Sequence, residues 1–332
     1  MTVGKYGKLD KTSRLFALFI LVLFSGLRYG VGVDYFSYED LFYSGELAAW
    51  IEPGFYFIME IVRNFDNSFT TFNILISFLT ISLLFFSLRE YDKAFVISLS
   101  LFFFSQSGLG FYFNGIRQGM AAAIFLFSYR YIEGNLFIKY CLCILAASLI
   151  HVSSLLLLPF FFLNKFGFNK VSSLILVFLA IILNYTGYIR KYLLDILGLF
   201  DNSLKYVSNE FLLNPSEVRS GFGFLLFNVF SVIFILFLPR KIAKSDLALN
   251  ANFFTAFIVL KNILFPIFIA YRFIVYLEWI SFISIPMLIY YRFDFNTRYI
   301  IFFIILLFYA SLFVAGLINP QNMLHYQSIY SR

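Results

Sequence analysis

Long apolar runs, separated by short charged turns, recur along most of the chain, from Leu15 to Gly316. Many of these runs approach the roughly 20 residues that an α-helix needs to cross the hydrocarbon layer of a bilayer. The pattern predicts an all-α, polytopic integral membrane protein with about 11 transmembrane helices. The expected spans are 15–27, 69–88, 94–105, 119–132, 136–150, 153–164, 171–188, 222–238, 252–270, 273–291 and 299–317.

Several of these spans are too short for a complete crossing, which predicts that some helices are broken or re-entrant. The apolar segment that follows Glu52-Pro53 is a candidate re-entrant helix, and Pro159, Pro266 and Pro286 mark expected kinks. The whole chain, 1–332, is expected to form a single transmembrane domain. The extracytoplasmic loop 187–220 has room for short interfacial helices.

Composition narrows the class of protein. Of the 332 residues, 61% are apolar and 13% are charged, a balance that no soluble domain can bury in one core. The net charge of +7 comes from Lys and Arg residues that stand singly in short loops, which argues against nucleic acid as a partner. These residues are more frequent on the side that holds the N-terminus, so the positive-inside tendency places that side in the cytoplasm. Cys141 and Cys143, two apart in an apolar run, are interpreted as packing residues rather than a disulfide or a metal site.

With this topology, the unusual polar residues gather at turns on the outer face. They are Arg28, Asp34, Glu52, Arg117, Gln118, His151 and Arg272. A charge placed toward the bilayer interior costs several kcal/mol unless it is partnered, so a functional role is the first hypothesis for each. Each also has a structural interpretation: a snorkelling arginine at a span end, a capping aspartate, a Glu-Pro helix start, or a packing histidine. Because all of these residues are predicted to lie on the same side of the membrane, a functional role is favoured over the structural interpretations.

These groups suit transfer from a diphosphate-activated donor. Arginine presents a planar fork that chelates phosphate oxygens, so Arg28, Arg117 and Arg272 can neutralise a departing pyrophosphate. A carboxylate or an imidazole can take the proton of an attacking sugar hydroxyl, and the candidates are Asp34, Glu52 and His151, with Asp34 preferred. Nearby arginines lower a carboxyl pKa and desolvation raises it, and the sequence leaves open which effect is larger.

Other polar residues lie within the spans or beside the outer loops. Lys261 and Glu278 fall at similar depth on adjacent spans, which predicts a structural ion pair, with a proton relay as the less favoured alternative. Tyrosines near the outer loops can stack on sugar rings, and they are Tyr35, Tyr38 and Tyr112.

The outer-face residues stand in motifs that resemble the EpsG-like family of exopolysaccharide and O-antigen polymerases, the Wzy-type enzymes. The motifs are Arg28-Tyr29-Gly30-Val31-Gly32-Val33-Asp34-Tyr35, Glu52-Pro53-Gly54-Phe55, Phe113-Asn114-Gly115-Ile116-Arg117-Gln118-Gly119-Met120-Ala121 and His151-Val152-Ser153-Ser154. A weaker similarity to the family is found in Arg272-Phe273 with Tyr276, and in His325-Tyr326-Gln327-Ser328. The motifs cover about the first half of the chain, and the second half is similar mainly in hydropathy.

The resemblance implies a glycosyltransferase of GT-C-like architecture in the bacterial inner membrane, with its active site facing the periplasm. Such an enzyme moves a growing glycan from undecaprenyl diphosphate to the non-reducing end of an incoming lipid-linked repeat unit, and it needs neither a metal nor a cofactor. Besides the substrate and membrane lipid, a separate polysaccharide co-polymerase that sets chain length is an implied partner. The sugar-binding residues that it implies are Tyr35, Gln118 and Tyr276.

Three other functions remain open at this point. A lipid-linked oligosaccharide flippase is expected to carry charged groups along the crossing path, whereas here they gather at one face. A membrane glycan O-acyltransferase is expected to have an essential histidine near its first span, whereas this chain has only His151 and His325. A purely structural membrane protein gives no reason for the outer-face cluster.

Overall fold

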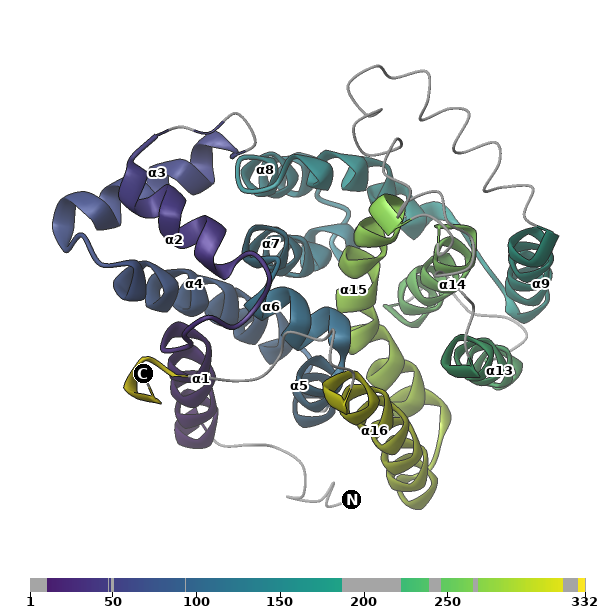
Figure 1. Cartoon of the computed structure of the whole chain (residues 1–332). Coiled ribbons are helices and arrows are strands. Elements are labelled where there is room, and N and C mark those ends of the chain that lie inside the picture. The colour runs from purple at the N-terminus through teal and green to yellow at the C-terminus, as the bar shows by residue number, and fades with distance from the viewer. Residues whose placement is uncertain are drawn as a thin grey trace. The chain divides into compact units, whose positions relative to one another are not determined.

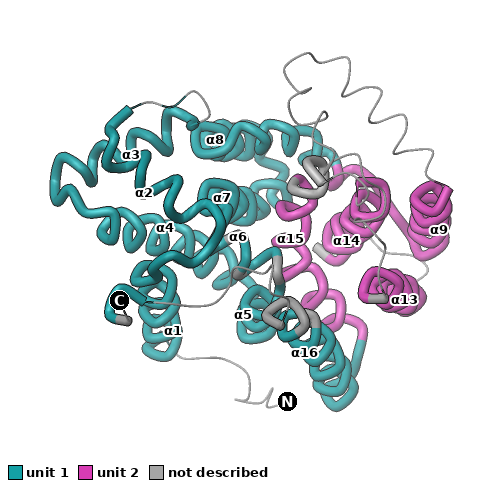
Figure 2. The backbone as a smooth tube through the Cα atoms, in the orientation of Figure 1, with its two compact units in different colours: residues 1–162, 293–332 teal, residues 163–292 magenta. Residues whose placement is uncertain are grey.

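The computed structural model describes residues 11–46, 48, 51–92, 94–186, 222–238, 246–264, 268–318 and 328–331. The chain divides into two compact units, unit 1 with Met1–Phe162 and Phe293–Arg332, and unit 2 with Leu163–Arg292 (Figure 2). All regular elements of the described residues are helices (Figure 1), which confirms the predicted all-α class. The loop expected over 187–220 lies outside the described residues, and the single-domain assignment stays a prediction.

Unit 1 holds most of the helices and all of the motifs from the first half of the chain. Its elements are α1 (Lys11–Gly26), α2 (Tyr35–Ser44), α3 (Pro53–Phe65), α4 (Phe69–Arg89), α5 (Phe95–Phe104), the π-helix η1 (Gln106–Gly110), α6 (Phe111–Phe113), α7 (Ile116–Glu133), α8 (Phe137–Ser148), most of the 3₁₀-helix η2 (Val152–Lys165), α16 (Phe295–Ile318) and η4 (Ile329–Ser331). Helix α4 packs against α1 and α7, and α7 packs against α8. The buried residues of α7 include Gly119, Ala121, Ala122 and Ala123, and side chains this small let helix backbones approach closely.

Unit 2 consists of α9 (Lys170–Thr186), α13 (Phe222–Leu236), α14 (Asp246–Leu264) and α15 (Phe268–Arg292). Helix α14 packs against α15 and α9. The predicted ion pair is confirmed, because the Lys261 Nζ lies 3.6 Å from a Glu278 carboxylate oxygen. The same ammonium lies 4.3 Å from the centre of the Phe227 ring, so a cation–π contact adds to its stabilisation.

Three described helices are long and apolar enough to cross a membrane, and they are Phe69–Arg89, Leu247–Leu264 and Phe273–Arg292. Six shorter apolar helices accompany them: Phe95–Phe104, Phe137–Ser148, Val152–Lys165, Lys170–Thr186, Gly223–Leu236 and Phe295–Ser311. The chain is therefore a membrane protein by its helices, while the total of 11 spans stays a prediction. At about 2.0 Å per residue, the 14-residue η2 reaches about 28 Å, close to a full hydrocarbon thickness.

One predicted boundary is wrong. The sequence places Arg272 at a turn between two spans, but α15 begins at Phe268 and runs through Arg272 to Arg292. The expected turn at this point rested on the charge of one arginine, and arginine is a good helix former. Neither glycine nor proline stands between Phe268 and Arg272, so the helix continues through this stretch.

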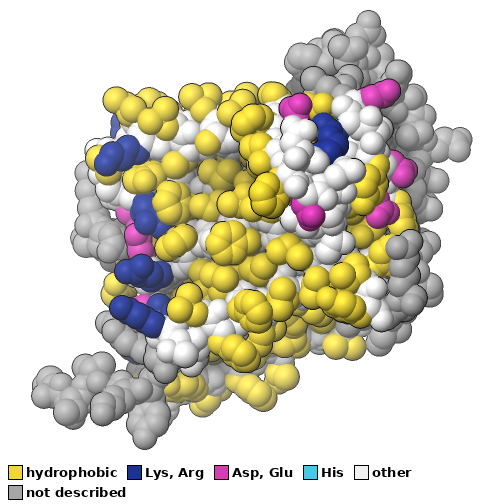
Figure 3. All heavy atoms as spheres, turned by 90° about the vertical axis from the view of Figure 1, so that its left-hand side faces the viewer, with side chains coloured by type: hydrophobic (Ala, Val, Ile, Leu, Met, Phe, Trp, Pro, Cys, Tyr) yellow, Lys and Arg dark blue, Asp and Glu magenta, His cyan; other side chains and the backbone are white. Residues whose placement is uncertain are grey.

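The outer surface of α1, α3 and α4 is apolar, with exposed side chains that include Phe16, Phe19, Phe57, Phe78 and Phe86. Figure 3 shows a broad apolar band on this side of the molecule, with most of the visible Lys and Arg side chains along one edge and most of the visible Asp and Glu side chains toward the opposite edge. Such a band is what lipid contact requires.

Candidate functional site

The first turn of α3 is joined to the end of α8 through the backbone. Gly54 N–H and Phe55 N–H both donate to the Leu149 carbonyl, at 2.9 and 3.2 Å. Pro53, at the first helical position, has no N–H to satisfy. The unpaired amides that begin one helix thus meet a carbonyl that ends another, which also aligns the two helix dipoles favourably. This junction places Glu52, the N-cap residue of α3, beside the turn that carries His151.

Replacing Gly54 with alanine should break this junction. A Cβ there would lie 2.7 Å from the Leu149 carbonyl oxygen and 2.8 Å from the Leu149 Cβ, closer than real Cβ contacts. We expect a loss of about 1–3 kcal/mol in unfolding free energy, as for other overpacked sites, measured as a lower thermal midpoint in detergent. Gly167→Ala is the control, because no atom lies within 4 Å of its added Cβ. Equal midpoints for both variants would contradict the expected clash.

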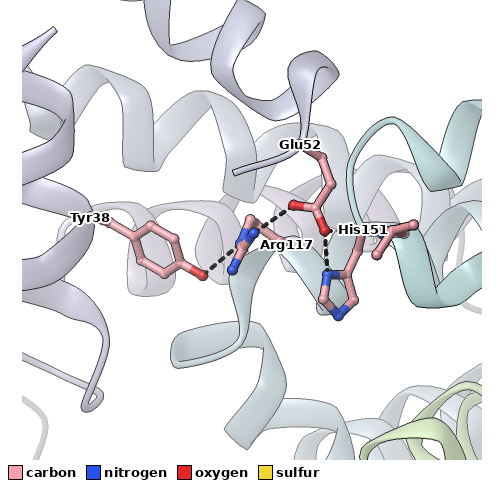
Figure 4. Close-up of polar contacts among 5 residues, drawn as sticks. Tyr38, Glu52, Arg117 and His151 are labelled. Atoms are coloured by element: carbon pink, nitrogen blue, oxygen red, sulfur yellow. Dashed lines mark hydrogen bonds and ion pairs between the residues drawn. The ribbon is translucent and has the colours of Figure 1, made fainter. Parts of the chain in front are cut away.

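Glu52 is the centre of the candidate site. Its Oε1 accepts a hydrogen bond from Val152 N–H at 3.0 Å and lies 2.9 Å from His151 Nδ1, and its Oε2 pairs with Arg117 Nη1 at 2.5 Å (Figure 4). The three side chains come from the start of α3, the first turn of α7 and the turn between α8 and η2. They remain partly exposed, at 12% for Glu52, 15% for Arg117 and 21% for His151. The structure therefore brings together three of the predicted site residues.

Tyr38 adds a fourth side chain to this group. Its hydroxyl oxygen accepts a hydrogen bond from Arg117 Nε at 3.1 Å, and the guanidinium lies 5.8 Å from its ring centre (Figure 4). Tyr38 belongs to the buried stripe of α2, with Tyr35, Leu41 and Phe42. Burial raises the pKa of Tyr38, although Arg117 opposes this, so the phenol stays neutral and can direct its own proton away from the arginine. We name Tyr38, Glu52, Arg117 and His151 the outer cluster.

Burial and polar neighbours have opposite effects on the pKa of Glu52, and the neighbours have the larger effect. Burial favours a higher pKa, but hydrogen bonds from His151 and Val152 and the charge of Arg117 outweigh it and lower the pKa from 4.5 to about 2. A carboxyl group with a lowered pKa stabilises the fold above its unfolded pKa, near 4.5, and this stabilisation is lost as the pH falls toward 2. At neutral pH, Glu52 is therefore an anion that holds its neighbours and takes up protons poorly.

Arg28 lies in a separate buried network in unit 1. Its guanidinium donates to the Ser25 carbonyl at 2.7 Å and to Asn73 Oδ1 at 3.2 Å, which ties the end of α1 to α4. It also lies 5.9 Å from the centre of the Tyr35 ring. Because Arg28 is only 2% exposed, a diphosphate can reach it only if neighbouring side chains move. Its predicted role in pyrophosphate binding stays a prediction.

Asp34 stands at the N-cap position of α2, partly buried, and its side chain makes no capping hydrogen bond to that helix. Its backbone N–H donates to Asn114 Oδ1 at 3.0 Å, so the loop before α2 is fixed to the start of α7. Gly32 makes this contact possible, since its φ of +99° is rarely adopted by other residues and an added Cβ would lie 3.0 Å from the same Asn114 oxygen. Asp34 is also close enough to raise the pKa of Tyr38, so it belongs to the surroundings of the outer cluster.

The remaining predicted site residues are Tyr35, Gln118, Tyr276 and Arg272. Tyr35 is 3% exposed and packs edge-on against Tyr29 and Phe69, and Gln118 is 4% exposed on α7. Tyr276 is buried in α15 of unit 2, and the side chain of Arg272 lies outside the described residues. Their sugar-binding and pyrophosphate-binding roles stay predictions. Among the described residues, no group of three or more His, Cys, Asp or Glu side chains is arranged to hold a metal ion.

Two residues of this region, Tyr38 and Asn114, were not assigned these contacts from the sequence. Tyr38 was expected only to stack on sugars, and Asn114 was part of a motif without an assigned role. A signal was present for Tyr38, because a tyrosine in the apolar stripe of a short helix must find a hydrogen-bond partner for its buried hydroxyl. For Asn114, the neighbouring Gly115 marked a break between helices, where a side-chain amide often holds a loop.

Comparison with known protein families matches residues 11–328 to the EpsG family. No curated protein and no solved structure matches the chain. The matched range includes every residue of the outer cluster and nearly the whole chain. The chain therefore belongs to the EpsG family, and this membership indicates a membrane protein of the polysaccharide-polymerase type.

Proposed function

We propose that this chain joins lipid-linked oligosaccharide repeat units into O-antigen or exopolysaccharide. In this reaction the growing glycan leaves undecaprenyl diphosphate and is transferred to the non-reducing end of an incoming undecaprenyl-diphosphate-linked unit. The observation that carries the proposal is the outer cluster, in which an arginine, a carboxylate and an imidazole from three separate elements meet while remaining partly exposed. Membership of the EpsG family supports the same class of reaction.

Arg117 is the proposed ligand for the donor diphosphate. Its charge is held in place by Glu52 and Tyr38, so the guanidinium is oriented before any substrate binds. A preorganised cation stabilises the charge that develops on a leaving diphosphate without the cost of ordering the side chain during the reaction. Arg28 and Arg272 are proposed as further diphosphate ligands on the basis of the sequence motifs.

We place the protein in the bacterial inner membrane, as a multi-pass protein of GT-C-like architecture whose outer cluster faces the periplasm. Charge at the helix ends of unit 1 supports this orientation. Arg14 pairs with Asp92 and Arg130 pairs with Glu90, near the start of α1 and the end of α7, whereas Arg117 lies at the opposite end of α7. The basic end is the one expected in the cytoplasm. A polysaccharide co-polymerase that controls chain length is the proposed protein partner.

The test is an assay with purified protein in detergent or liposomes and an undecaprenyl-diphosphate-linked repeat unit. We expect a ladder of longer glycans on electrophoresis. In cells, loss of the gene should leave surface polysaccharide as single-unit caps. Loss of those caps as well would instead indicate a flippase, and an unchanged substrate in the purified assay would contradict the proposed polymerase.

A further inference from the structure

The hydrogen-bond partners of Glu52 decide which nitrogen of His151 carries a proton. Val152 N–H and Arg117 Nη1–H can only donate, and both point to the Glu52 carboxylate. An ionised Glu52 can accept a hydrogen bond from each of them, because both of its oxygens are acceptors. The ion pair with Arg117 and the lowered pKa of Glu52 together indicate an ionised carboxylate, so the third hydrogen bond comes from His151 Nδ1–H.

With the proton on Nδ1, the neutral His151 ring keeps its lone pair on Nε2. Figure 4 shows the imidazole turned so that its second nitrogen points away from Glu52. The side chain is 21% exposed, so part of the ring is accessible to an approaching hydroxyl group. The turn between α8 and η2 is itself held by the backbone junction at Leu149, so the ring is fixed at both its base and its Nδ1 edge.

We infer that His151 Nε2 is the general base that accepts the proton of the acceptor sugar hydroxyl, and that Glu52 is the positioning residue that fixes its tautomer. This rests on the proposed polymerase function. As the acceptor oxygen forms its bond to the anomeric carbon of the donor glycan, its proton passes to Nε2. The bond between that carbon and the diphosphate oxygen breaks, and its electron pair leaves with undecaprenyl diphosphate beside Arg117. The imidazolium that forms is stabilised by the Glu52 carboxylate.

This assignment differs from the sequence-based preference for Asp34 as the base. Asp34 stands at the N-cap of α2, where the positive end of the helix dipole favours the ionised form and weakens the carboxylate as a base. Glu52 already accepts three hydrogen bonds. Within the described part of the chain, the ionisable groups that contact His151 or its partners include Glu52 on α3, Arg117 on α7 and Tyr38 on α2.

The test compares His151→Asn with wild type. The asparagine amide can still donate to Glu52 from near the Nδ1 position, but the variant has no Nε2. We expect ladder formation to slow at least 100-fold, in the range typical of a lost general base, while retention of radiolabelled lipid-linked donor on the protein stays within twofold of wild type. Ser148→Ala is the control, because its exposed hydroxyl bonds only within its own helix, to the Leu145 carbonyl, and we expect the wild-type rate.

Two results with His151→Asn would overturn the inference: a rate above one third of wild type, or a loss of donor binding that accompanies the loss of rate. A third such result is a wild-type rate that stays constant between about pH 5 and 8, the range in which an imidazole changes its protonation. The last measurement needs no variant and so does not depend on the folding of His151→Asn. If wild type itself forms no ladder, the proposed polymerase fails; if wild type forms a ladder and the variant does as well, only the assignment of His151 fails.

Discussion

Replacing Arg117 with alanine is expected to abolish visible ladders and to lower the polymerisation rate by about 1,000-fold. The side chain provides the positive charge closest to the ionised Glu52 and His151, and losing one preorganised electrostatic donor typically costs 100- to 1,000-fold. Donor binding should weaken together with the rate, because the Arg117 guanidinium is the proposed partner of the negatively charged diphosphate. The measurements are the ladder assay and retention of radiolabelled donor. Arg117→Lys should recover little, because an ammonium cannot bond Tyr38 and Glu52 in a planar fork.

The matched control is Arg130→Ala. Arg130 lies on the same helix as Arg117, and it also forms an ion pair, with Glu90 at 2.6 Å, at the other end of α7. If the loss in Arg117→Ala came only from a weakened helix, Arg130→Ala would lower the rate by a similar factor. We expect the control to polymerise within about threefold of wild type. A full ladder from a well-folded Arg117→Ala protein would remove this arginine from the site.

Replacing Glu52 with glutamine is expected to lower both activity and stability. The neutral side chain leaves the Arg117 guanidinium without its charge partner at a partly buried site, which should cost about 2 kcal/mol of unfolding free energy, less than for a fully buried pair. The glutamine amide can also donate to His151 Nδ1, which stabilises the tautomer with its proton on Nε2. We expect an additional loss of about 1,000-fold in rate, measured on protein that remains folded at the assay temperature.

Glu60→Gln is the control for this change. Glu60 is on the same helix, α3, but its side chain is exposed. The variant should keep both the thermal midpoint and the rate. An unchanged midpoint and an unchanged rate in Glu52→Gln would show that the carboxylate charge is unnecessary, and the electrostatic account of the outer cluster would fail.

The positions of the membrane helices could be predicted because they depend on the local pattern of apolar residues. The expected span at 69–88 corresponds to α4, Phe69–Arg89, and the expected first span at 15–27 to α1, Lys11–Gly26. The error at Arg272 arose because a single charged residue between apolar runs was interpreted as a turn, whereas arginine is a good helix former and α15 runs through it. The 3₁₀ geometry of η2 was also hidden, since 3₁₀- and α-helices share similar apolar patterns over short lengths.

The members of the outer cluster could be predicted as far as they are charged groups at the ends of helices. Glu52, Arg117 and His151 met this criterion, and so did Arg28, which the structure places in a different network with Asn73. Which of these groups touch depends on how α3 packs against α8, and that depends on contacts between residues about 100 positions apart in the sequence. Tyr38 could not be assigned to Arg117 for the same reason.

The two oxygens of Glu52 serve two different neighbours, one cationic and one a proton acceptor in the proposed reaction. An anion that binds Arg117 draws the guanidinium charge away from Oε2 and leaves more of the carboxylate charge to act on the imidazole. The two binding events are thus energetically linked, and the linkage is reciprocal. Filling the donor position should make His151 a stronger proton acceptor, and protonation of His151 should tighten the hold on the donor. In the proposed reaction, His151 would therefore be most basic when the donor diphosphate occupies the position beside Arg117.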